Sequence, residues 1–408
     1  MKSHVLVYPL AAALWLLPPV GAAAQSADAQ PAPPSRAAAI EQAQAEKAKA
    51  LRPYTPNRAE EIFERIEETF LSGGLHWHPF FEGAYAGGGF TLGAGYARHV
   101  SSYNVLDLRG SFTFSGYKRL EAEFRAPRLF DRRGVLSVVA GWREATQVGF
   151  YGLGTGSTAK SNRANYSFQQ PFAAATLDYR PMRNWLVLQG GLEVSQWKQD
   201  TGAGEAPSVE EVYTPATLPG LGAQPTYLHA LAGVRLDSRD SPGYARSGGS
   251  LGVTLHDYAD QDGQFGFQRV EYDAIQHLPV LIDTWVLSLH ARLETTVSKD
   301  GQDLPFFMLP ALGGGSTLRG YTSWRFRDRH SVLVQAEWRV LANRYLDAAL
   351  FYDAGKVTAR RDDLDLKNLK SDFGLGFRLH GPLSTPLRIE FAKGNEGLVL
   401  VFSAKAAF

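Results

Sequence analysis

The chain has 408 residues, no cysteine and a formal net charge of +1 at pH 7. The lack of cysteine excludes disulfides and thiolate metal sites, and the balanced charge gives no electrostatic footprint for nucleic acid. The 41 glycines and an aromatic content of 12% are typical of a chain with many strands and turns.

The first 24 residues have the features of a secretory signal peptide. Residues 5–20 are apolar but contain three prolines, and Ala22, Ala23 and Ala24 supply the small side chains of a cleavage site. This apolar run is too short and too broken for a membrane-spanning helix. We predict a signal peptide over residues 1–24, with an uncleaved membrane anchor as the alternative.

Two short segments follow before a repeated pattern begins. Residues 25–57 are rich in Ala, Pro, Gln and Lys, which predicts a flexible linker. Residues 58–74 are predicted to form a short amphipathic helix, because apolar residues recur at every fourth position at Ile62, Ile66 and Phe70. The helix would lie against the rim of the following domain or plug its periplasmic mouth, and partner binding is the alternative.

Residues 75–408 alternate between apolar and polar side chains, most clearly late in the chain. Over residues 331–340 one face carries Val332, Val334, Ala336, Trp338 and Val340, and the other carries Ser331, Leu333, Gln335, Glu337 and Arg339. A period of two predicts strands. Apolar side chains outside and charged ones inside suit a lipid-facing barrel, whereas a soluble sandwich would use the two faces in the opposite way. The period alone does not separate the two, but the signal peptide and the strand lengths favour the membrane barrel.

We predict sixteen strands, over residues 77–85, 89–99, 103–115, 117–126, 134–148, 165–179, 184–199, 226–237, 249–258, 265–278, 284–297, 330–341, 345–357, 371–380, 386–393 and 398–408. The longest connections, at 149–164, 200–225, 298–329 and 358–370, each join an odd-numbered strand to the next even-numbered one, so they lie on one side. Outer-membrane barrels have long external loops and short periplasmic turns. The predicted fold is therefore all-β: a 16-stranded antiparallel transmembrane β-barrel of the bacterial outer membrane, with both termini in the periplasm.

The longest of these connections contains the stretch LPALGGGSTLRGY, residues 309–321. Its three consecutive glycines allow backbone angles closed to other residues, and an arginine follows in a tight turn. The motif residues are Gly313, Gly314, Gly315, Leu318, Arg319, Gly320 and Tyr321. The loop resembles the Gly-Gly…Val-Arg-Gly-Phe/Tyr loop of the BamA/TamA family of outer-membrane assembly and translocation barrels (bacterial surface antigen family). The resemblance covers roughly the last 180 residues well and the first half of the barrel only loosely.

The resemblance implies that the loop folds into the barrel lumen, where its arginine meets carboxylates on the inner wall. Glu337 and Asp353 stand at the matching positions. Family members that handle substrates usually carry periplasmic modules of a mixed α/β fold before the barrel, and residues 25–74 are too few for such a module. The resemblance therefore implies a short member that lacks the substrate-handling modules.

The last predicted strand places Leu398, Leu400, Phe402 and Phe408 on one face. A terminal aromatic residue on such a strand resembles the signal by which the barrel-assembly machinery recognises and inserts its clients. We assign this insertion signal to Phe402 and Phe408, which implies that the chain is a client of that machinery. An ordinary final strand that ends in phenylalanine is the alternative.

No pattern for catalysis or for binding a metal or cofactor stands out. His76 and His78 are the closest pair of histidines, but no third ligand lies near them in the sequence. The glycines of residues 152–156 fail the spacing of a dinucleotide site, and no Gly-x-Ser-x-Gly motif lies near Ser316. We predict no enzyme activity, no catalytic residue, no metal site and no cofactor.

Three functions are consistent with the sequence. The first is a barrel that assists insertion or translocation of proteins or lipids with a separate periplasmic partner, and it predicts a weak seam between the first and last strands. The second is a passive channel or structural barrel that keeps the loop as a folding device. The third, an outer-membrane hydrolase, lacks a serine or carboxylate constellation. In each case we expect a monomer surrounded by outer-membrane lipid and lipopolysaccharide.

Overall fold

The computed structural model describes residues 41–42, 44–46, 76–156, 159–182, 185–343, 345–381, 385–403 and 407–408. Residues 41–42 and 44–46 are helical. The rest of the predicted signal peptide, linker and amphipathic helix lies outside the described residues. Within the described part of the chain, no helix is long and apolar enough to cross a membrane.

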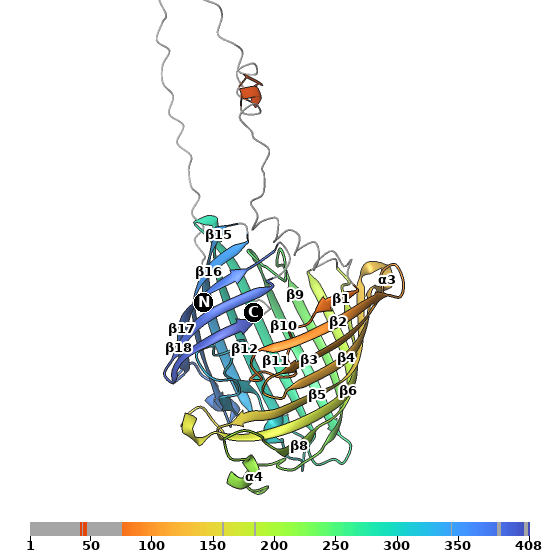
Figure 1. The fold of residues 1–408 in the computed structure, drawn as a ribbon, viewed down its shortest axis with the longest axis vertical. Helices are drawn as coiled ribbons and strands as arrows, with labels where there is room; N and C mark the ends of the chain where they lie inside the picture. Colours follow the sequence, from red (N-terminus) through yellow and green to blue (C-terminus); the bar gives the residue numbers. More distant parts are fainter. Residues whose placement is uncertain are drawn as a thin grey trace, which may run out of the picture. The chain divides into compact units, whose positions relative to one another are not determined.

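Antiparallel strands form the wall of a β-barrel (Figure 1). β7 and β8 both pair with β6 and together make one interrupted wall strand. The described wall therefore has the predicted sixteen strands, because β1 to β12 supply eleven and β15 to β19 supply five. Their bounds are β1 (Trp77–Pro79), β2 (Thr91–His99), β3 (Val105–Thr113), β4 (Lys118–Arg128), β5 (Gly134–Phe150), β6 (Ala164–Tyr179), β7 (Leu186–Gln196), β8 (Lys198–Thr201), β9 (Thr226–Asp237), β10 (Gly248–Asp260), β11 (Phe267–Val280), β12 (Ile282–Ser298), β15 (His330–Asn343), β16 (Leu346–Thr358), β17 (Lys370–Leu379), β18 (Leu387–Gly394) and β19 (Gly397–Ser403).

The connections between wall strands are long at one end of the barrel and short at the other. Because neighbouring wall strands run antiparallel, the connections at 151–163, 202–225, 299–329 and 359–369 lie at the same end. We call this the long-loop end, where Figure 1 shows α4 (Val209–Val212); α3 (Leu129–Arg132) marks the opposite turn end. The other short elements are η1 (Lys160–Asn162), η2 (Phe306–Met308), η3 (Arg361–Asp363) and the paired strands β13 (Ala311–Leu312) and β14 (Phe326–Arg327).

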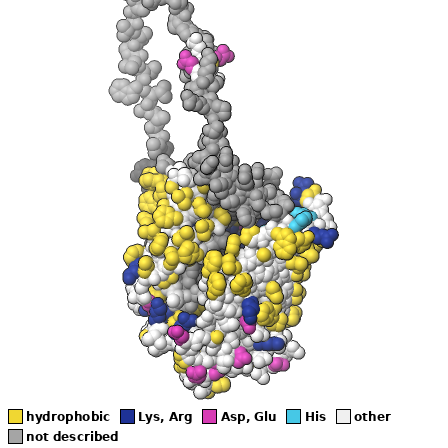
Figure 2. Space-filling model, in the orientation of Figure 1, with side chains coloured by type: hydrophobic (Ala, Val, Ile, Leu, Met, Phe, Trp, Pro, Cys, Tyr) yellow, Lys and Arg dark blue, Asp and Glu magenta, His cyan; other side chains and the backbone are white. Residues whose placement is uncertain are grey.

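The wall has an apolar outer face and a polar inner face. Directly paired residues of neighbouring strands point to the same side of the sheet, so the pairs show which residues share a face. Trp338 pairs with Leu350 on the outer face, and both are exposed. Glu337 pairs with Ser288 and Phe351 on the inner face and is only 2% exposed. Figure 2 shows hydrophobic side chains spread over the outside of the wall. This is the arrangement of a membrane barrel, as the alternation predicted.

The first wall strand is shorter than the predicted 77–85. Its backbone pairing with β2 ends at Phe80, and the chain then enters the lumen. There Tyr85 packs against Phe168 of β6 with ring centroids 4.2 Å apart. Burial of such aromatic rings is favourable, which explains why residues 81–85 do not continue along the wall as predicted.

The seam between β1 and β19 lacks the backbone pairing found elsewhere in the wall. Every other neighbouring pair of wall strands has a residue-by-residue register, but among the described residues no register joins β19 to β1 or β2. His76 and Phe80 bond to β2, so by the alternation of an antiparallel pair Trp77 and Pro79 turn their backbone groups towards the seam. Pro79 has no N–H to donate. The seam edge of β1 is therefore short and poor in donors.

The described part of the last strand covers Gly397–Ser403, and residues 407–408 lie outside any strand. Phe402 lies exposed on the outer face, as predicted, but Phe408 does not share that face. The ring of Phe408 stacks on the buried imidazoles of His290 and His277, with centroid distances of 5.0 and 6.4 Å. A contact between rings so far apart in the chain leaves no sign in the alternation of a single strand.

Candidate functional site

The connection between β12 and β15, residues 299–329, carries the glycine-rich motif, and we call it the lumen loop. Its stem is the pair β13 and β14, in which Leu312 is directly opposite Phe326. At its tip the Gly314 N–H donates to the carbonyl oxygens of Leu318 and Tyr321, both at 3.1 Å. These bonds fold the tip into a compact turn, and its side chains at Leu318 and Tyr321 are almost fully buried.

Glycines permit this turn and its close approach to the wall. Gly313 and Gly314 have φ values of +116° and +101°, in the region that favours glycine. At Gly320 the reason is space, since an added Cβ would lie 2.5 Å from Cβ of Asp372 and 2.7 Å from the backbone nitrogen of Gly394. The backbone of the tip can therefore reach the inner wall only without a side chain at that position.

The Arg319 guanidinium is the centre of the site and is fully buried. Its Nε and Nη2 donate to the two carboxylate oxygens of Asp353, each at 2.7 Å. Its Nη1 donates to Glu337 at 3.0 Å and to Glu390 at 2.9 Å. Three wall strands, β15, β16 and β18, thus each present one carboxylate to a single loop cation, in charge-assisted hydrogen bonds.

These partners keep the arginine charged despite its burial. Burial alone would lower the pKa of Arg319, but the hydrogen bonds and charge of Asp353 and the charges of Glu337 and Glu390 raise that pKa above its ordinary value. The ring of Phe351 lies against the guanidinium, with its centroid 3.5 Å from Cζ. The site is therefore a closed ionic contact between loop and wall.

Several wall residues extend this contact beyond the two carboxylates that the sequence motif singled out. Glu390 is the third carboxylate on Arg319, and Arg378 donates to both Glu337 and Glu390. Arg388 donates from Nη2 to the carbonyl oxygen of Gly315 at 2.7 Å. In the sequence, Arg378, Arg388 and Glu390 alternate with apolar residues, which places them on the polar face of β17 and β18. Only the three-dimensional register shows that they meet the loop.

Apolar packing and further hydrogen bonds hold the tip on the same side of the lumen. Leu318 and Tyr321 join a buried cluster with Leu312, Phe326, Leu333 and Val357. The Tyr321 hydroxyl donates to the carbonyl oxygen of Ser371 at 3.2 Å. The motif residues therefore act together: the glycines shape the turn, Arg319 carries the charge, and Leu318 and Tyr321 are buried against the wall.

The lumen loop also contacts the chain that follows β1. The indole N–H of Trp324 donates to the carbonyl oxygen of Ala86 at 2.8 Å. Arg325 donates to Glu396, in the turn between β18 and β19, with contacts of 2.6 to 3.0 Å. The loop is thus attached to the segment that follows β1 by one hydrogen bond, and to the turn that precedes β19 by an ion pair.

Aromatic side chains occupy the lumen at the long-loop end. The ring of Phe306, in the lumen loop, packs on Tyr166 of β6 with centroids 4.9 Å apart. The same buried cluster contains Phe150, Phe168, Tyr227, Phe267, Phe306 and Phe307. This cluster and the lumen loop fill space that an open channel would leave to water.

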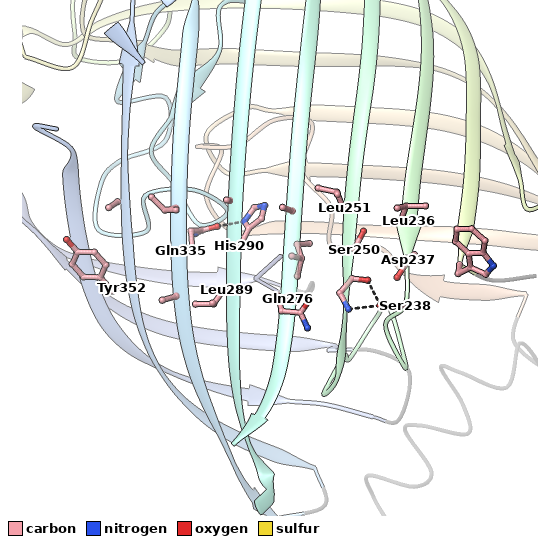
Figure 3. A pocket seen from close by; sticks show the side chains of 18 residues that line it. Leu236, Asp237, Ser238, Ser250, Leu251, Gln276, Leu289, His290, Gln335 and Tyr352 are labelled. Carbon is pink, nitrogen blue, oxygen red and sulfur yellow. Dashed lines mark hydrogen bonds between the residues drawn. The ribbon is translucent and has the colours of Figure 1, made fainter. Parts of the chain in front are cut away.

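The described residues offer little for catalysis or metal binding. Within them, no group of three His, Cys, Asp or Glu side chains could hold a metal ion. Side chains of β9 to β12, β15 and β16 line a groove of about 720 Å³ at the wall. Figure 3 shows these side chains, with His290 bonded to Gln335. The other ring nitrogen of His290 is bonded to Asp273 at 2.8 Å. We therefore place the candidate site at Arg319 rather than at this groove.

Comparison with known proteins agrees with this architecture. The Omp85 superfamily domain matches residues 82–397. BamA from Haemophilus ducreyi lacking POTRA domains 1–3 is similar in structure, with a TM-score of 0.60 at 16% identity over 80% of this chain and 69% of that chain. CdiB from Escherichia coli gives a TM-score of 0.51 at 13% identity over 79% of this chain and 58% of that chain. No curated protein matches the chain by sequence.

Proposed function

Because this chain belongs to the Omp85 superfamily, we propose that it assists the insertion or translocation of proteins or lipids through a seam between β1 and β19. Similar barrels of this superfamily are bacterial outer-membrane proteins. We further propose that the turn end faces the periplasm, with both termini on that side, and that a separate periplasmic partner delivers the substrate.

The seam is the observation that carries this proposal. An unpaired sheet edge is costly in hydrocarbon, because its N–H and C=O groups find no water there. β1 offers only Trp77–Pro79 and its seam edge lacks the N–H of Pro79. In this proposal the edge of β19 over residues 397–402, for which no register with β1 is found among the described residues, is available to a strand from another chain, as in recognition by strand addition.

The filled lumen argues against the alternative of a passive channel. Sixteen-stranded porins leave an aqueous channel, whereas here Arg319, the buried tip and the aromatic cluster occupy the lumen. The Arg319 contact supports a role as an anchor for the loop rather than as a catalytic group. In this proposal the loop, which is bonded to the segments next to both seam strands, sets how firmly the seam stays closed.

The test is in-cell photocrosslinking with a benzophenone amino acid on the outer face of β19, at Phe402, followed by mass spectrometry. The matched control position is Leu255 on β10, which is also exposed on the outer face of the barrel. We expect protein or lipid substrates crosslinked at Phe402 but not at Leu255. The same products at both positions would show general contact with the membrane and would contradict a substrate path at the seam.

A further inference from the structure

The turn between β4 and β5 has an unusual backbone. Phe130, Asp131 and Arg132 have φ values of 51°, 55° and 68°, so three consecutive residues with side chains adopt the left-handed region. Such a conformation is strained for each of them, and strain of this kind persists where the surroundings impose it, often at functional sites. The turn directs an aromatic ring outwards, since Phe130 is 60% exposed.

Four arginines surround this turn without neutralising partners. They are Arg128, Arg132, Arg133 and Arg180, and the last two are joined by a backbone hydrogen bond of 2.7 Å from Arg180 N–H to Arg133 oxygen. Among the described residues none of these four forms an ion pair, whereas the buried arginines around Arg319 do. Asp131 is the one acid within the turn, so this surface has a clear excess of positive charge.

The arginines lie where the apolar wall ends. Alternation places Leu120, Ala122 and Phe124 on the outward face of β4, and the buried Ala126 and the exposed Arg128 follow at the next positions of the same row. Its guanidinium lies 3.6 Å from the ring centroid of Tyr103, and Phe130 packs on Tyr179 with centroids 5.8 Å apart. Figure 2 shows Lys and Arg side chains at the corner of the barrel where Figure 1 places α3. Cations and aromatic rings therefore share the boundary of the lipid-facing surface.

We propose that Arg128, Arg132, Arg133 and Arg180 bind the phosphate of an anionic phospholipid headgroup. Guanidinium groups recognise phosphate oxygens through paired hydrogen bonds, aromatic rings favour the headgroup level, and basic clusters there attract anionic lipids. The outward row of β4 favours a lipid over an acidic protein, because Arg128 continues a row that faces hydrocarbon. The choice of leaflet rests on the proposed function, because the proposed orientation of the barrel places the turn end, and so this site, in the periplasmic leaflet.

Native mass spectrometry of the full-length barrel in detergent, titrated with phosphatidylglycerol, tests the site. We expect the Arg128→Gln, Arg132→Gln, Arg133→Gln triple variant to bind this lipid at least about tenfold more weakly at low salt, since each basic residue near a membrane surface adds substantially to anionic-lipid binding. The matched control removes three exposed arginines of the long-loop end, with Arg329→Gln, Arg360→Gln and Arg361→Gln, and should bind like the unmodified protein. The corresponding triple lysine variant should retain most of the binding.

Equal lipid binding by the two glutamine variants would overturn the proposal, as would binding of zwitterionic phosphatidylcholine as tight as that of phosphatidylglycerol. Glycerol phosphate that binds as tightly as the whole lipid would also overturn it, by showing a site for soluble phosphate. Migration of the folded band on a semi-native gel confirms that each variant is folded. The readout involves no substrate, so a failure here leaves the seam proposal standing, and crosslinking that fails at Phe402 leaves the lipid site standing.

Discussion

Trp324 donates its indole N–H to the carbonyl oxygen of Ala86 at 2.8 Å, and this bond joins the lumen loop to the segment that follows the first wall strand, 238 residues earlier in the chain. Trp324 holds a positive φ of 63°, which is unfavourable for a residue with a large side chain. The guanidinium of Arg327 lies 4.7 Å from its ring centroid. These contacts hold a strained residue at the point where the loop meets the segment that follows the seam strand.

Removing this bond should loosen the seam strand. Trp324→Phe keeps an aromatic ring but removes the N–H, and a net hydrogen bond contributes about 0.5–1.5 kcal/mol. We expect hydrogen exchange of residues 76–80 to become roughly two- to tenfold faster, because local opening controls exchange. The control is Trp338→Phe on the outer wall, and identical exchange in the two variants would contradict the link between loop and seam.

Arg319 should stabilise the folded barrel strongly. Removing one partner of a buried ion pair costs about 3–5 kcal/mol, and water in the lumen would reduce that cost. Arg319→Ala should therefore lower the temperature at which the folded band disappears on a semi-native gel. Arg361→Ala, in an exposed position of the long-loop end, should not change it. Equal melting of the two variants would reject the anchoring role of Arg319.

Gly320→Ala should displace the loop tip without removing any charge. The new Cβ would lie 2.5 Å from Cβ of Asp372, and overpacking of this kind typically costs about 1–3 kcal/mol. The expected result is a lower melting temperature on the same gel. Gly190→Ala is the control, because a Cβ at Gly190 meets no heavy atom within 4 Å. A Gly320→Ala barrel as stable as the control would show that the tip does not rest on the wall.

The filled lumen predicts poor conductance in planar bilayers, despite a strand number that gives porins an aqueous channel. Deleting Gly313–Tyr321 should raise the single-channel conductance, because it removes both the tip and its anchor. An unmodified barrel that already conducts like an open porin would instead favour the passive channel. Deleting residues 57–71, within and beside the predicted amphipathic helix, is expected to add a smaller increase.

The wall could be predicted from sequence because the alternation of apolar and polar residues within a strand shows which side chains point outwards and which point inwards. The period of two in β15 placed Glu337 inside and Trp338 outside without any knowledge of neighbours. The same local rule failed at residues 81–85, where Tyr85 leaves the wall for an aromatic cluster built from distant segments. It failed again at Phe408, whose contacts with His277 and His290 depend on the opposite wall.

The residues of the site that belong to the sequence motif could be predicted. The residues that reach the site only through the register between neighbouring strands could not. The motif identified Arg319, Glu337 and Asp353, and the structure brings these three together. Glu390 was known only as a charged residue opposite an apolar face, because nothing in β18 indicates how far it lies from the loop. Its contact with Arg319 depends on the stagger of β18 against β16 and β15, which only the folded barrel defines.

The central claim is that β1 and β19 form an unpaired seam, and disulfide crosslinking tests it most directly. The chain contains no native cysteine, so every bond formed between engineered cysteines is unambiguous. Cysteine at Trp77 should be combined in turn with cysteine at Leu398, Leu400 and Phe402, and the control pair is Val234 and Val253, which are directly opposite in β9 and β10. We predict near-complete crosslinking of the control under mild oxidation and only partial crosslinking for every seam pair. A seam pair that crosslinks as completely as the control would show a closed wall and contradict the account.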